Sequence, residues 1–167
     1  MTLGKMSYAE IARAEVYIAA LQHPGRGFMA YDRRRPAPSG DPDGAILGGI
    51  VPTIASLAGN NKEMSLGNLP AGYVLQVGDY LGFSYGSSPE RHALHRVVSL
   101  EVVADELGVT PVFEVTPHIR PGASIGSAVR LIRPACKAII VPDSFDPGTN
   151  ARRITEGMKF RFKQTLR

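Results

Sequence analysis

Glycine and proline recur along the whole chain and divide it into short segments. The 167 residues include 18 glycines and 13 prolines, which are spread through the sequence rather than gathered in one tail. Proline fixes φ and lacks a backbone donor, and glycine adopts conformations closed to other residues, so both favour turns. About nine segments of strand length lie between these turns. The sequence therefore predicts a mainly β fold, either a β-sandwich or a small β-barrel, with one packed N-terminal α-helix.

The helix is predicted near the N-terminus. Ser7 and Glu10 have the spacing of a capping box, which satisfies backbone donors at a helix start. His23-Pro24-Gly25 ends the segment, because proline cannot continue a helix. Four apolar residues between these signals recur with the helical period of 3.6 and define the face expected to pack: Ile11, Ala14, Ile18 and Leu21.

The remaining apolar segments are predicted to be strands. The last of them alternates most clearly, with Lys159, Arg161 and Lys163 on one face. The opposite face carries Met158, Phe160, Phe162, Gln164 and Leu166. The predicted strands are 27–32, 45–54, 64–69, 73–85 with a bend at 78–79, 92–103, 111–116, 128–132, 137–141 and 158–166.

The length fits a single domain, which usually holds about 100–200 residues. Residues 1–32 contain the helix and the first strand, and residues 33–44 form a basic loop rich in proline and glycine. Residues 45–167 form the β-rich region. We expect these three regions to make one structural unit overall.

The cysteine content and the hydropathy limit the cellular setting. A single cysteine excludes an internal disulfide framework and a cysteine-rich zinc site, and it favours an intracellular protein. No segment has the charged, apolar and small-residue regions of a secretion signal. The longest weakly polar segment, 45–58, is too short and too interrupted to cross a bilayer, so no membrane partner is expected.

One segment matches a catalytic motif. Residues 82–86 read Gly-Phe-Ser-Tyr-Gly, the G-x-S-x-G pattern that exposes a nucleophilic serine at a strand-to-helix turn. The order along the chain would allow Asp105 as the acid and His118 as the base for Ser84. However, the sequence shows little of the βαβ alternation that builds such a sheet. We therefore predict no catalytic residue, and a small serine hydrolase using Ser84 is the alternative.

Metal and cofactor sites are not predicted. His92 and His95 are three residues apart in a predicted strand, which places them on opposite faces. Asp41 and Asp43 lie among prolines and glycines, where such carboxylates usually accept hydrogen bonds from the backbone of a turn. No glycine-rich loop has the lysine and helix that hold a phosphate.

The basic residues include two local groups. The chain has 19 basic and 15 acidic residues, and three of the basic ones, Arg33, Arg34 and Arg35, are consecutive. The second group is Lys159, Arg161 and Lys163 in the last strand. The run 33–35 has no interleaved aromatic residues to stack on bases, so specific nucleic-acid binding is not expected. We predict that all six are subunit-interface residues for an acidic neighbour, and a solvated surface is the alternative.

Several stretches of the sequence, taken in order, resemble those of a known protein family. They are the helix 10–21 running into 26–36, then 69–83, 95–98, 104–108, 115–120 and 126–134. This succession resembles the distal tail proteins, found in the baseplate or tail tip, of siphophages and of phage-derived gene transfer agents. The resemblance covers about residues 8–166. No single motif in it is specific, and the order of the motifs carries it.

The resemblance implies a structural virion protein that forms a ring, commonly a hexamer, between the tail tube and the baseplate hub. It implies the tube and hub proteins as partners, with the tape measure protein as a further candidate. It also implies assembly in the bacterial host cytoplasm, a final location at the tail tip, no cofactor and no enzymatic activity. Similar proteins carry more β structure before the helix, so another minor tail or terminator subunit is an alternative. A free carbohydrate-binding module is a further alternative, disfavoured by the absence of tryptophan.

Overall fold

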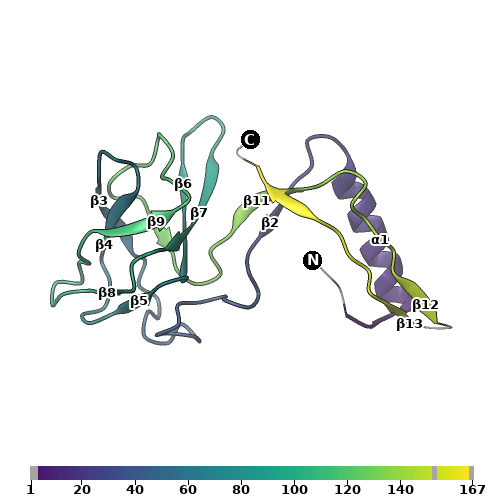
Figure 1. The fold of residues 1–167 in the computed structure, drawn as a ribbon, viewed down its shortest axis with the longest axis horizontal. Helices are drawn as coiled ribbons and strands as arrows, with labels where there is room; N and C mark the ends of the chain where they lie inside the picture. The colour runs from purple at the N-terminus through teal and green to yellow at the C-terminus, as the bar shows by residue number, and fades with distance from the viewer. Residues whose placement is uncertain (1–3, 152–153, 166–167) are drawn as a thin grey trace. The chain divides into compact units, whose positions relative to one another are not determined.

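The computed structural model describes residues 4–151 and 154–165 and shows a mainly β chain with one helix (Figure 1). The chain divides into two compact units. Unit 1 combines Met1–Ala30 with Lys137–Leu166, and unit 2 contains Tyr31–Cys136. The segment 137–166 thus groups with the helix, whereas the sequence grouped it with the β-rich region 45–167. The physical reason is that the helix obtains its core from the C-terminal segment.

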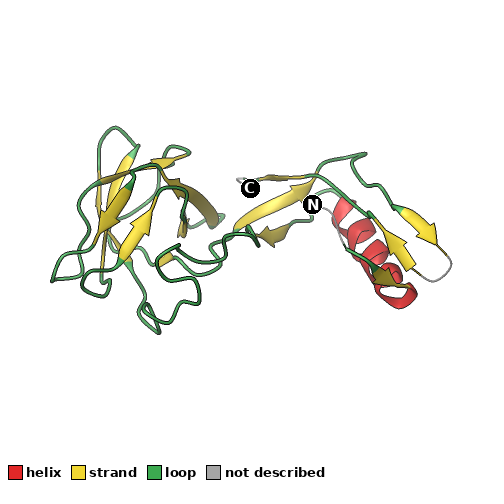
Figure 2. Ribbon diagram, turned by 60° about the horizontal axis from the view of Figure 1, so that its bottom comes forward, coloured by secondary structure: helices red, strands yellow, loops and turns green. Residues whose placement is uncertain are grey.

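Unit 2 is built on a six-stranded antiparallel sheet, drawn in yellow in Figure 2. Its order is β10-β6-β7-β9-β4-β3. Ile54 in β3 accepts a hydrogen bond from Gly126 N–H at 2.8 Å and donates one to Ser127 O at 3.0 Å, and an isolated bridge joins Thr53 to Ala128. The two edge strands are thereby joined, and the sheet nearly closes into a small barrel. The strands are β3 (Thr53–Leu57), β4 (Glu63–Gly67), β6 (Tyr80–Tyr85), β7 (Arg91–Val97), β9 (Phe113–Thr116) and β10 (Val129–Arg130).

A two-stranded antiparallel ribbon accompanies this sheet. It pairs β5 (Val74–Gln76) with β8 (Glu101–Val103). Alternation along both strands places Leu75 and Val102 in the core and leaves their neighbours on the outer side. The largest fully buried hydrophobic residues of unit 2 come from both the sheet and the ribbon: Ile54, Met64, Leu66, Leu75, Leu81, Val102, Val115, Val129 and Leu131.

Unit 1 packs the helix α1 (Tyr8–Gln22) on residues from the other end of the chain. Ile11 and Ile18 of α1 are buried in a cluster with Ile140, Met158 and Phe160. Ser7 N–H donates to the Glu10 carboxylate at 2.8 Å, as the capping signal predicts. Two small sheets belong to this unit, with the orders β1-β13-β12 and β14-β11-β2. Their strands are β1 (Met6–Ser7), β2 (Phe28–Ala30), β11 (Cys136–Ile140), β12 (Thr149–Ala151), β13 (Ile154–Glu156) and β14 (Phe162–Gln164).

The fold class is confirmed, but three strand predictions need correction. The predicted strand 92–103 is two strands, because Val98 N–H bonds Glu114 O while Leu100 O accepts from Val77 N–H. Residues 45–52 form turns and loop, and the strand begins only at Thr53. In the last predicted strand, Met158 and Phe160 are buried as expected, but regular pairing covers only Phe162–Gln164. Leu166 lies outside the described residues.

A buried carboxylate organises the loop that replaces the predicted strand. Asp41 is 1% exposed and accepts hydrogen bonds from the N–H groups of Ile46 and Leu47, both at 3.0 Å, and from Tyr73 Oη at 3.2 Å. Burial raises the pKa of Asp41, but these bonds lower it more, so that it stays below its ordinary value. Asp43 is exposed, and its carboxylate accepts a hydrogen bond from Ala45 N–H. The expected backbone-bonding role of both residues is confirmed.

We predict that Asp41→Ala lowers the free energy of unfolding by about 2–4 kcal/mol, because it leaves several buried donors without an acceptor. Urea denaturation followed by circular dichroism measures the change. Asp43→Ala is the matched control and should change stability by less than about 0.5 kcal/mol. Equal losses for the two variants would contradict this account of the loop.

His95 lies in the core of unit 2 and is 2% exposed. Its Nδ1 lies 2.7 Å from Pro117 O, and its ring stacks on Phe83 with centroids 5.3 Å apart. Because a carbonyl oxygen can only accept, Nδ1 carries the proton, and the buried Nε2 has no hydrogen-bond partner among the described residues. Burial lowers the pKa of His95, the charge of Arg120 lowers it further, and the bond to Pro117 opposes both. His95 is therefore held neutral.

We predict that this histidine makes the fold sensitive to acid. The unfolded chain binds a proton at His95 below the ordinary pKa of 6.5, and the folded chain binds it only at lower pH. The unfolding free energy should therefore fall as the pH decreases from the ordinary pKa of His95 toward its lower pKa in the folded chain, by at most about 1.4 kcal/mol per pH unit. His95→Gln should remove this part of the slope in urea titrations from pH 7.5 to pH 5, whereas His118→Gln, at an exposed site, should retain it. An unchanged slope in His95→Gln would refute the prediction.

Candidate subunit interface

The arginine run 33–35 is held in place by the rest of unit 2. Arg34 Nε and Nη2 each donate to the Asp32 carboxylate at 3.1 Å, and this bond lowers the pKa of Asp32. Arg35 Nη1 donates to Gly78 O at 3.1 Å. Arg33 is exposed and makes no side-chain hydrogen bond or ion pair within residues 4–151 and 154–165. Arg34 and Arg35 are thus anchored by hydrogen bonds, and the guanidinium group of Arg33 is available to a partner.

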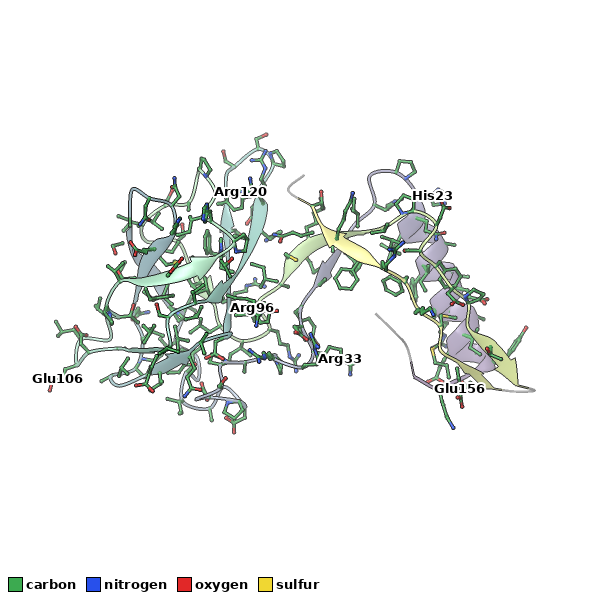
Figure 3. All side chains as sticks on the ribbon, viewed as in Figure 1. His23, Arg33, Arg96, Glu106, Arg120 and Glu156 are labelled. Carbon is green, nitrogen blue, oxygen red and sulfur yellow. The ribbon has the colours of Figure 1, made fainter. Side chains whose placement is uncertain are left out.

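A fourth arginine joins the arginine run. Arg96 pairs with Tyr80 across β6 and β7, and its guanidinium carbon lies 5.2 Å from the centroid of the Tyr80 ring. A Cβ at Gly78, where φ is +87°, would lie 3.3 Å from Arg96 Nη2 and would collide with Arg35 Nη1. Both guanidinium groups therefore meet at Gly78. The sequence did not identify Arg96, because only the strand pairing brings it to the arginine run. Figure 3 labels Arg33 and Arg96 and shows Glu106 at the opposite end of unit 2.

The second predicted basic group lies on unit 1. Lys159 forms an ion pair of 3.2 Å with Asp146, and the backbones of the two residues exchange hydrogen bonds of 2.8 and 2.9 Å. The bond from Gly148 N–H, and then Lys159, lowers the pKa of Asp146. Arg161 and Lys163 are exposed, and their side chains have no ion-pair partner in the described part of the chain. Lys159 is exposed as well, so all three basic residues of this segment are exposed.

This segment forms part of a mixed basic and apolar surface. Phe162 contacts Phe28 edge-on, with centroids 5.5 Å apart, on the inner side of the sheet β14-β11-β2. Lys163 pairs with Ile139, and alternation places both on the outer side. The outer side also carries Met29, which follows Phe28 in β2 and is 48% exposed. We name this surface the basic sheet face, defined by Met29, Lys137, Ile139, Arg161 and Lys163.

The candidate catalytic residues do not assemble into a triad. Ser84 lies inside the hairpin β6–β7, and the chain continues after a turn into a strand rather than a helix. Its Oγ lies 3.2 Å from Nδ1 of His92, its cross-strand partner. Asp105 accepts hydrogen bonds from Leu107 and Val109 within its own turn. No hydrogen bond between described residues joins Ser84 to Asp105 or His118.

Metal ligands are likewise not gathered. His92 is half-buried beside Ser84, whereas His95 is buried in the core, so the two histidines face opposite sides of β7 as predicted. Among the described residues, no three histidine, cysteine, aspartate or glutamate side chains are grouped to hold a metal ion. Cys136 is buried, and this burial raises the pKa of its thiol.

Within the described ranges, no helix has both the length and the apolar character needed to cross a bilayer.

Comparison of the chain with protein-family models, with curated proteins and with solved structures found no match.

We predict that Arg35→Ala loosens the loop that follows the arginine run, because the bond to Gly78 O joins this loop to the barrel. Thermolysin should cleave the segment 31–51 about fivefold to tenfold faster, as expected for a lost hydrogen bond from a charged donor. Arg33→Ala is the matched control and should be cleaved at the wild-type rate. Mass spectrometry of the fragments measures both rates, and indistinguishable rates would show that Arg35 does not anchor the loop.

Proposed function

We propose that this chain is a structural virion protein of a phage-like tail tip, where its copies form a ring that joins the tail tube to the baseplate hub. The ordered sequence motifs support this role. The structure adds a buried core in unit 2 and exposed apolar side chains suited to contact with other subunits.

The observation that carries the proposal is the exposure of large apolar side chains on ordered elements. On α1, Val16 lies opposite the packed Ile11 and Ile18 and is 68% exposed, while Tyr8 (79% exposed) and Tyr17 (69% exposed) flank the packed face on its two sides. A helix that is apolar on both sides is usually buried on both. In unit 2, Leu100 is 83% exposed and Leu107 85%. Such surfaces mark contacts with other proteins, so this chain is best explained as one subunit of a larger assembly.

The proposed partners follow from the resemblance. They are further copies of the chain in a hexameric ring, the tail tube protein on one side and the baseplate hub protein on the other, with the tape measure protein as a further candidate. The protein would be assembled in the cytoplasm of the bacterial host and would end at the tail tip of the virion. Another minor tail or terminator subunit would use the same surfaces and is the closest alternative.

The contact between Ser84 and His92 is the one observation that favours a serine hydrolase. A nucleophilic serine needs a base that is itself oriented by a third group, and it needs donors for the oxyanion. Asp105 is engaged in its own turn, and Ser84 lies in an antiparallel hairpin rather than at a strand-to-helix turn. We therefore propose that the protein has no enzymatic activity and needs no cofactor.

The hydrolase alternative predicts a reaction that our proposal does not. A fluorophosphonate probe, which labels activated serines, should not label the wild-type protein above the level of Ser84→Ala. In-gel fluorescence measures the labelling, with a known serine hydrolase as the positive control. Labelling that is lost in Ser84→Ala would contradict the structural role.

The ring proposal is tested by electron microscopy. Negative-stain images of the purified protein should show rings with a central opening. Immunogold labelling of particles from the bacterium that encodes the chain should place it at the tail tip. Gold particles along the tube or on the capsid would contradict the proposed position, and particles without label would contradict the virion role.

A further inference from the structure

The outer side of the ribbon β5–β8 is an apolar surface with carboxylates. Because Leu75 and Val102 point into the core, alternation directs Glu101 and Val103 outward. Val77 and Leu100 lie just beyond the strands at one end of the ribbon, joined by the bond from Val77 N–H to Leu100 O, and Glu106 and Leu107 lie in the turn that follows β8 at the other end; all four side chains are exposed. We name this surface the β5–β8 face, defined by Val77, Leu100, Glu101, Val103, Glu106 and Leu107.

The exposure and the charge of the β5–β8 face are those of an uncovered protein contact. Leu100 and Leu107 have the highest exposed fractions among the large hydrophobic residues of the described chain, and Val77 is 51% exposed. Glu101 and Glu106 are exposed and form no ion pair with any described residue. An exposed apolar patch with charged residues at its margin is typical of a protein-binding surface.

Two arginines lie at one end of this face. Arg35 and Arg96 meet at Gly78, next to Val77. Figure 3 shows Glu106 at the other end of unit 2, away from Arg33 and Arg96. A partner that covers Glu101 and Glu106 must therefore supply cations, and it must supply apolar groups for Leu100 and Leu107.

The chain itself carries a surface with these properties. Residues 1–30 and 137–166 contain nine basic and five acidic residues, whereas residues 31–136 contain nine basic and ten acidic ones. The positive charge of the protein is therefore concentrated in unit 1. The basic sheet face presents Arg161 and Lys163 beside the apolar side chains of Met29 and Ile139. Its cations and its apolar centre match the carboxylates and the leucines of the β5–β8 face.

We propose that the basic sheet face of one copy of this chain docks on the β5–β8 face of a second copy. Arg161 and Lys163 pair with Glu101 and Glu106, and Met29 and Ile139 cover exposed leucines. The contact is made by side chains of the two faces.

This contact joins two different surfaces, and such heterologous contacts generate a closed ring when the rotation between copies closes. The inference thus deepens the proposed function and rests on it for the ring geometry. The apolar groups supply affinity, while the ion pairs select the partner surface and its orientation.

The test uses two charge-reversed variants of the full chain. The first carries Arg161→Glu with Lys163→Glu, and the second carries Glu101→Lys with Glu106→Lys. Size-exclusion chromatography with light scattering measures the concentration at which each protein assembles. The wild type should form oligomers, and each variant alone should need at least about tenfold more protein, because like charges then meet at the contact.

An equimolar mixture of the two variants should assemble again at the wild-type concentration. In the mixture, the reversed sheet face of the first variant meets the reversed β5–β8 face of the second, and the two unchanged faces also match. This recovery requires a contact between copies, since a contact within one chain would stay repulsive in both variants. Arg26→Glu with Lys62→Glu is the control for net charge and should assemble like the wild type. Circular dichroism verifies that every variant is folded.

A further substitution tests the apolar part of the same contact. Leu107→Ala, at a turn residue that is 85% exposed, should weaken assembly about fivefold or more without changing stability. This variant also keeps the proposal falsifiable if one of the charge-reversed proteins fails to fold.

Three results would overturn the inference: a wild type that stays monomeric, variants that assemble alone like the wild type, or a mixture that does not recover. Rings that persist in both charge variants would remove this contact and leave the proposed ring standing. Particles that lack the protein at the tail tip would remove the proposed function, whatever the charge variants do.

Discussion

Hydrogen bonds between Ile54 and residues 126–127 nearly close the six-stranded sheet of unit 2, and the rest of this unit depends on that contact. An open sheet would leave two edge strands with unpaired backbone groups, which readily pair with other chains. With β3 and β10 joined, the barrel surrounds its own core and offers partners its outer surfaces. The loops and the ribbon β5–β8 therefore carry the features through which this unit can contact other proteins.

Unit 1 depends on a different constraint, which is that the two ends of the chain complete one core. The helix buries Ile11 and Ile18 against Met158, Phe160 and Ile140, so neither end has this core without the other. The second side of the helix remains apolar and exposed, with Val16 and Tyr17 uncovered. A chain that leaves apolar side chains on its helix and on its barrel unit is suited to an assembly rather than to isolated function.

The charged and polar residues illustrate how context decides chemistry. Asp41 resembles any loop aspartate in sequence, yet its buried carboxylate holds the loop 41–47 and Tyr73. Ser84 has the spacing of a hydrolase motif, yet an antiparallel hairpin presents it to His92 without a third group from the predicted triad. Arg35 belongs to a basic run, yet its role in the structure is a bond to Gly78 O. In all three cases the residue type and the spacing were compatible with more than one role, and only the neighbouring residues in the fold show which role applies.

The local structure could be predicted from the sequence: the capped helix, its packed face, the turns at glycine and proline, and the alternation that exposes Lys159, Arg161 and Lys163. These features depend on neighbouring residues and on periodicity, which are written in the chain directly. The tertiary structure alone decided that residues 137–165 pack with the helix, that 92–103 is two strands, and that Arg96 joins the arginine run at Gly78. It also decided which carboxylates stay exposed beside Leu100 and Leu107. These outcomes depend on pairings between residues far apart in the chain, whose partners local propensity does not specify.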